Sequence, residues 1–99
     1  MNNLPYTFKL NDKETYPVRI TFSKLLSLKK KNKSMYEKYN DIIIKGAKDI
    51  FDYAYIVYIG YVNECNDKPM SFEEFIDKMD YDMPNIISTV GELVNSKKK

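Results

Sequence analysis

The sequence predicts a mainly α-helical (α+β) domain in which an N-terminal β-hairpin precedes a bundle of four to five helices. Apolar residues alternate with polar ones over residues 6–20 and recur at helical spacing over residues 21–95. The 99 residues suffice for one compact domain and leave no room for a second. We therefore expect a single domain over residues 1–99, with a hairpin at 6–20, helices at 21–95 and a flexible tail at 96–99.

The hairpin is predicted from two short segments, residues 6–10 and 15–20, in which every second side chain is apolar or aromatic. The polar residues 11–14 between them have the length of a hairpin loop. Because Pro17 has no amide proton to donate, we expect it at the start or the open edge of the second strand.

The first helix is predicted to begin at a cap formed by Thr21 or Ser23 and to end in the lysine-rich residues 29–33. Cations there complement the negative end of the helix dipole. These lysines are also the candidate nucleic-acid patch of the sequence, because two tyrosines follow them. Arg19 is the lone arginine, and nearby acidic residues dilute the positive charge, so nucleic-acid binding ranks behind protein binding.

The second and third helices are predicted over residues 34–46 and from 47 to about 65. Ser34 and Glu37 have the spacing of a capping box for the second helix, and Gly46 is suited to end it. The third helix carries two adjacent apolar stripes, so we expect it to be central and covered on most sides. Its apolar stretch is too short to cross a bilayer, and the chain has no signal peptide, so we expect a cytoplasmic protein.

The last two helices follow a loop at residues 66–69. Ser71 and Glu74 form a second capping box, and Asp82 can cap the final helix with Pro84 in its first turn. The apolar residues expected on the core face of the fourth helix are Phe72, Phe75, Ile76 and Met79. Those expected to be buried by the last helix are Ile86, Ile87, Val90, Leu93 and Val94.

The residues needed for catalysis are scarce. The chain has no His, which removes the commonest general base and transition-metal ligand. Cys65 is the lone cysteine, and its acidic neighbours Glu64 and Asp67 disfavour a reactive thiolate. The sequence therefore predicts no enzyme activity, no catalytic residues and no cofactor.

An acidic cluster at Asp77, Asp80 and Asp82 has the wrong spacing for a calcium loop. Such a loop needs Gly at its sixth position and Glu at its twelfth, where this chain has Asp82 and Ser88. We expect turn and cap residues here and no metal site.

Aromatic residues on the central helix suggest a protein-binding role. The chain has nine Tyr and five Phe, more ring surface than so small a core easily encloses. Some of the tyrosines are therefore expected at an interface, where Tyr is enriched, and the chain is expected to form homo-oligomers. The candidate protein-binding residues are Tyr53, Tyr55, Tyr58 and Tyr61.

The run KPMSFEEFIDKMDYDM at residues 68–83 resembles the tail assembly chaperones of long-tailed bacteriophages and prophages of Gram-positive bacteria. An opening hairpin, a long aromatic-rich helix and an MSFEEF helix followed by an acidic turn are similar to that family in order and length. The similarity is concentrated in residues 55–93.

The resemblance implies a protein that binds the tape measure protein, and possibly the tail tube protein, and prevents aggregation of the tape measure until tube subunits polymerise around it. Such a chaperone is absent from the mature virion and self-associates. Many members are made in two forms, the longer by a ribosomal frameshift. The alternative from the residues alone is a small phage-encoded nucleic-acid-binding regulatory protein, based on residues 29–33.

Overall fold

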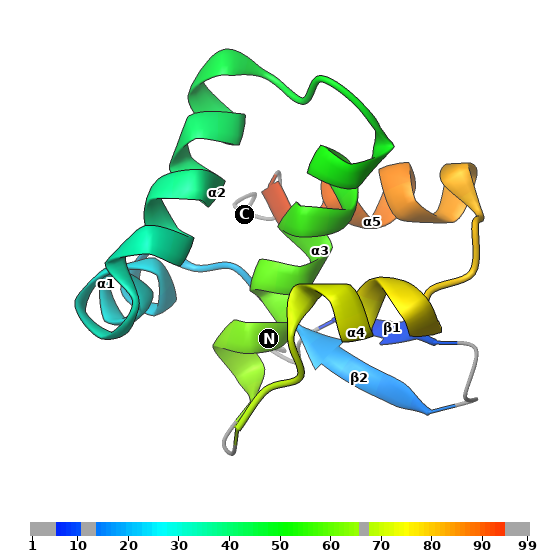
Figure 1. The fold of residues 1–99 in the computed structure, drawn as a ribbon, viewed down its shortest axis with the longest axis horizontal. Helices are drawn as coiled ribbons and strands as arrows, with labels where there is room; N and C mark the ends of the chain where they lie inside the picture. Colours follow the sequence, from blue (N-terminus) through cyan, green and yellow to red (C-terminus); the bar gives the residue numbers. More distant parts are fainter. Residues whose placement is uncertain (1–5, 11–13, 66–67, 95–99) are drawn as a thin grey trace.

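The computed structural model describes residues 6–10, 14–65 and 68–94 and shows a hairpin followed, in these ranges, by five helices (Figure 1). The α+β prediction is therefore confirmed. The predicted tail, residues 96–99, lies outside the described residues. The elements are β1 (Tyr6–Lys9), β2 (Thr15–Val18), α1 (Phe22–Lys31), α2 (Lys33–Lys45), α3 (Ile50–Glu64), α4 (Phe72–Lys78) and α5 (Met83–Val94).

The hairpin pairs β1 and β2 in antiparallel register, with Phe8 opposite Tyr16 and Thr7 opposite Pro17. Pro17 lies inside β2 and is exposed, which a sheet of two edge strands permits. The inward side chains Phe8 and Val18 are buried, as the alternation predicts. Both strands are shorter than predicted. β2 ends at Val18 because the amide of the next residue, Arg19, forms a hydrogen bond with α3 instead of with β1.

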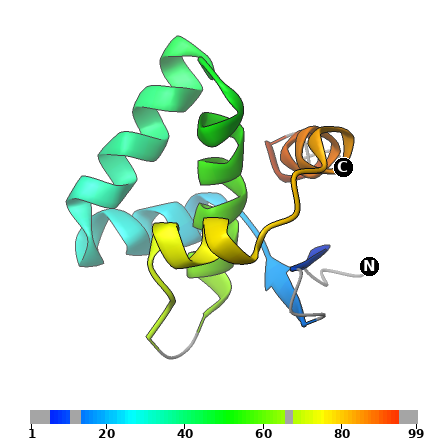
Figure 2. The ribbon, with the colours of Figure 1, turned by 45° about the vertical axis from the view of Figure 1, so that its right-hand side comes forward.

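Helix α3 is the central element, as its double apolar stripe predicts. Every residue from Ala54 to Tyr61 is buried. Figure 2 shows α1 and α2 on one side of α3 and α5 on the other. The chain after β2 approaches α3 closely at Gly60, whose carbonyl accepts a hydrogen bond of 3.1 Å from the amide of Arg19. A Cβ at Gly60 would lie 3.1 Å from the Cβ of Val18, so glycine permits this approach.

The helix boundaries follow local capping. Thr21 is the cap of α1, since its hydroxyl accepts a hydrogen bond of 3.2 Å from the amide of Lys24. The predicted cap Ser34 is wrong: the side chain of Asn32 accepts from the amide of Met35 at 3.1 Å, and α2 begins at Lys33. Asn32 alone separates α1 from α2, and it caps the C-terminal end of α1 and the N-terminal end of α2. Gly46 ends α2 with a φ of 92°.

The last two helices begin where predicted. Ser71 caps α4 through a 3.1 Å bond from the amide of Glu74, and Asp82 caps α5 through a 3.2 Å bond from the amide of Asn85. Phe75 of α4 is fully buried. The prediction that Ile87 and Val94 are buried is wrong: their exposed fractions are 42% and 40%. The apolar side of α5 is wider than the part that α3 covers, and these two residues lie at its uncovered margin.

Candidate protein-binding surface

The four candidate tyrosines lie mostly in the core of the single chain. Tyr55, Tyr58 and Tyr61 are buried, and Tyr53 is partly buried and packs against the core. The rings of Tyr55 and Tyr58 contact Phe72, with centroid distances of 5.0 and 5.3 Å. A protein-binding role for these tyrosines stays a prediction, and the burial of three of them gives it no support.

Tyr58 and Tyr61 both form hydrogen bonds with the backbone of Met70, in the segment that precedes α4. The hydroxyl of Tyr58 donates to the carbonyl of Met70 at 2.8 Å, and the hydroxyl of Tyr61 accepts from the amide of Met70 at 2.9 Å. Burial, followed by the neighbouring Tyr55 and Tyr61, raises the pKa of Tyr58 to about 12. The rings also line a shallow hollow of about 730 Å³ with residues 68–71. Their hydroxyls therefore serve the fold, and little of either side chain is exposed to this hollow.

The lysine run lies at the exposed end of α1. Lys29, Lys30 and Lys31 are exposed, and no carboxylate of the described residues forms an ion pair with them. The ammonium of Lys29 lies 5.5 Å from the centroid of the Tyr36 ring, a cation–π contact between α1 and α2. This patch is positively charged, with an aromatic ring beside it.

A different set of residues forms an apolar groove between the α1–α2 pair and the C-terminal end of α5. Its volume is about 450 Å³. The residues that line this apolar groove are Ile20, Thr21, Phe22, Leu25, Tyr39, Ile43, Leu93 and Val94.

Several large apolar side chains of the groove are exposed. The exposed fraction is 92% for Phe22, 44% for Ile43 and 40% for Val94. Leu26, one turn beyond Phe22 on the same side of α1, is also exposed. Exposed apolar residues that gather in a concave site typically mark a binding surface for another protein.

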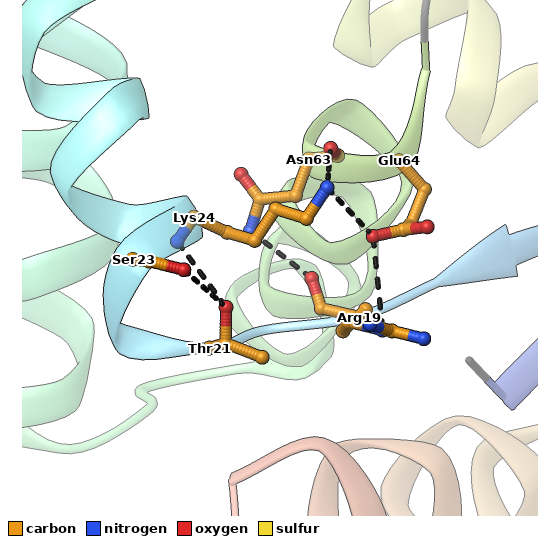
Figure 3. A network of polar contacts seen from close by, with 6 residues as sticks. All are labelled: Arg19, Thr21, Ser23, Lys24, Asn63 and Glu64. Carbon is orange, nitrogen blue, oxygen red and sulfur yellow. Dashed lines mark hydrogen bonds and ion pairs between the residues drawn. The ribbon is translucent and has the colours of Figure 1, made fainter. Parts of the chain in front are cut away.

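The position of α1, and with it the groove, is fixed by a polar network at the C-terminal end of α3 (Figure 3). The ammonium of Lys24 lies 3.2 Å from a carboxylate oxygen of Glu64 and donates to the carbonyl of Asn63 at 3.4 Å. The side-chain amide of Asn63 donates to the carbonyl of Arg19 at 3.1 Å, and the Arg19 guanidinium lies 3.8 Å from Glu64. Lys24 is unfavourable in the first turn of α1, and Glu64 in the last turn of α3, so their pairing offsets both helix-dipole costs.

A second apolar hollow lies on another part of the surface, where α3 begins. It measures about 180 Å³ and includes the exposed rings of Phe51 and Tyr81. The acidic residue Asp80 also lines it, whereas no charged residue lines the apolar groove in the part of the chain that the structure describes. This hollow is smaller and is bounded by the connection between α4 and α5.

The sequence prediction missed the groove residues Phe22, Ile43 and Val94. Each lies at a helical position that continues an apolar stripe, and such a stripe does not show how wide a face the neighbouring helices cover. The signal was present in α2, where three consecutive isoleucines, 42–44, cannot all point to one side of a helix. Ile42 is buried, and Ile43 and Ile44 are exposed.

Comparison of the chain with protein-family models, curated proteins and solved structures finds no match. Within the described ranges, no three Cys, Asp or Glu residues come together as a metal site would need. None of the helices in those ranges has the length and apolar character that crossing a membrane requires.

Proposed function

We propose that this protein is a tail assembly chaperone of a long-tailed bacteriophage or prophage, which binds the tape measure protein and keeps it soluble until the tail tube polymerises. The proposal is supported by the resemblance carried by residues 68–83 and by the exposed apolar groove between the α1–α2 pair and α5. The protein would act in the cytoplasm of the bacterial host and be left out of the mature virion.

The apolar groove is the observation that carries the proposal. A tape measure protein is a very long helical chain that exposes apolar stripes before it is enclosed in the tube. An amphipathic helix can place such a stripe in a groove of this kind, with anchors spaced three and four residues apart. Phe22, which is almost wholly exposed, gains the most from being covered.

The same geometry suits a contact that must later be broken. The groove is open and its apolar residues are few, so the bound helix would be held by a small number of side chains. Tail tube subunits that cover more of the tape measure could then displace the chaperone. A dedicated active site is not required for this exchange.

Co-expression tests the proposal. The tape measure protein encoded beside this chain should be found in the insoluble fraction when expressed alone and in the soluble fraction when expressed with the chaperone. The variant Ile43→Gln, which removes an apolar side chain from the groove, should lose this protection. Ile44→Gln alters the adjacent exposed isoleucine, which does not line the groove, and should retain it. Equal solubility with and without the chain would contradict the proposal.

A nucleic-acid-binding regulator is the second candidate, favoured by lysines 29–31, which have no carboxylate partner in the described part of the chain and lie beside the ring of Tyr36. Binding through phosphate contacts weakens steeply as salt rises. Retention on heparin and on single-stranded DNA over a salt series therefore distinguishes the candidates. Tight, salt-dependent retention that Lys29→Gln reduces would favour the regulator.

A further inference from the structure

We infer that the apolar groove selects amphipathic helices that carry acidic residues about two turns beyond their apolar anchors. The inference rests on the proposed function, since it names the chemistry of the segment that the groove would hold. Three observations support it: the charge of the α1–α2 pair, the lack of a carboxylate partner for Lys29, Lys30 and Lys31 among the described residues, and the position of these lysines relative to the groove.

The α1–α2 pair is the basic part of the molecule. From Phe22 to Lys45 there are seven lysines and two acidic residues, Glu37 and Asp41, which leaves a net charge of +5. The whole chain has a net charge of only +2, so the remainder is acidic on balance, at −3. A ligand on this side of the molecule therefore meets a positive potential.

The lysines of this pair differ in their partners. Three of the seven have carboxylate partners: Lys24 contacts Glu64, Lys33 contacts Glu37 at 3.9 Å, and Lys45 contacts Asp41 at 3.1 Å. The ammonium of Lys38 lies 5.0 Å from the centroid of the Tyr55 ring. In contrast, Lys29, Lys30 and Lys31 have no carboxylate partner among the described residues. The positive charge without a carboxylate partner is therefore concentrated in the last turn of α1.

The spacing along α1 connects these lysines to the groove. Phe22, Leu26 and Lys29 are at positions i, i+4 and i+7 and so share one side of the helix, with Lys29 about 10 Å from Phe22 along the axis. On α2, Tyr36 and Ile43 are likewise seven residues apart. Because Lys29 lies over Tyr36, both helices place their apolar residues at one end and the cation at the other.

A helix in the groove would therefore extend from an apolar surface to a basic one. Acidic residues on its flank would meet Lys29, Lys30 and Lys31, whereas basic residues would be repelled. Each exposed ion pair contributes little, and two or three together favour an acidic over a basic flank by roughly tenfold at low salt. The preference should shrink as salt rises, while the apolar contribution remains.

The test uses the full chain and synthetic helical peptides of about 18 residues. All share one leucine stripe, and their flanks carry Glu, Gln or Lys. Binding of the labelled peptides is followed by fluorescence anisotropy at low and high salt. The Glu peptide should bind about tenfold more tightly than the Lys peptide at low salt, with the Gln peptide between them.

Two pairs of variants locate the contact. Ile43→Gln should weaken binding of all three peptides, and Ile44→Gln should not. The double variant Lys29→Gln, Lys30→Gln should remove the preference for the Glu peptide. The double variant Lys48→Gln, Lys68→Gln has the same net charge and should leave the preference in place.

Three results would overturn the inference. The first is equal binding of the Glu and Lys peptides, which leaves the co-expression test of the chaperone function unaffected. The second is self-association of the chain that Ile43→Gln abolishes, with no peptide binding, because a second copy would then occupy the groove. The third is binding of single-stranded DNA, but of no peptide, that depends on Lys29 and Lys30.

Discussion

Replacement of Phe75 by alanine should sharply destabilise the protein, because this ring is at the centre of the aromatic core. Its side chain is fully buried, and its ring stacks on Tyr61 at a centroid distance of 5.2 Å. The Tyr58 and Phe8 rings lie at 5.4 and 6.4 Å, so one side chain of α4 connects α3 to the hairpin. Truncation of a buried Phe costs about 3–5 kcal/mol, and a domain of this kind is stable by about 5–15 kcal/mol.

The expected loss can be measured by thermal unfolding, followed by circular dichroism, and by urea titration, followed by tyrosine fluorescence. A change of this size lowers the melting temperature of a small domain by at least about 12 °C. Phe22→Ala is the matched control: the same ring is removed from a position that is 92% exposed, and the stability should change by less than about 0.5 kcal/mol. If Phe75→Ala and Phe22→Ala unfold alike, α4 is not part of the core and the packing described above is incorrect.

Four further predictions concern stability and assembly. The pKa of Tyr58 is raised from 10.0 to about 12, so the protonated hydroxyl contributes fully to the free energy of unfolding below pH 10. That free energy should fall by about 1.4 kcal/mol per pH unit between these two values. Tyr58→Phe should therefore make the loss of stability at alkaline pH less steep. Glu64→Ala leaves Lys24 without its partner and should cost about 1–3 kcal/mol in urea titration, whereas an unchanged midpoint would show that the network is not stabilising. Gly60→Ala should destabilise by about 1–3 kcal/mol despite the better helix propensity of alanine, because the new Cβ crowds Val18; a gain in stability would mean that β2 can move away. Sedimentation at micromolar concentration should show self-association that is largely indifferent to salt, and a strict monomer would contradict this expectation.

The sequence was sufficient for the order and type of the elements. Period-two alternation and helical spacing report which side of each segment is apolar, and capping residues such as Ser71 and Asp82 mark helix starts by a local hydrogen bond. The cap of α2 was missed because both Asn32 and Ser34 are good caps, and sequence alone does not show which one follows the end of α1.

The candidate binding surface is harder to predict, for a physical reason. Periodicity identifies the apolar side of a helix but not how much of that side its neighbours cover. Tyr55, Tyr58 and Tyr61 are candidates for an interface because the chain has more aromatic rings than a small core easily holds. The structure nevertheless buries all three, and the backbone of Met70 forms hydrogen bonds with the hydroxyls of Tyr58 and Tyr61. The surplus apolar surface lies instead at Phe22 and Ile43, on helices that pack mainly on each other.

Amide chemical-shift mapping tests the central claim, that the apolar groove between the α1–α2 pair and α5 is where a helical partner binds. A segment of the tape measure protein that co-purifies with the chain would be titrated into the isotope-labelled protein. We predict that the largest shifts occur at groove residues, including Leu25, Ile43 and Val94. Shifts centred on the hollow beside Tyr58 and Tyr61, or on the hollow at Phe51 and Tyr81, with the groove unchanged, would contradict the account.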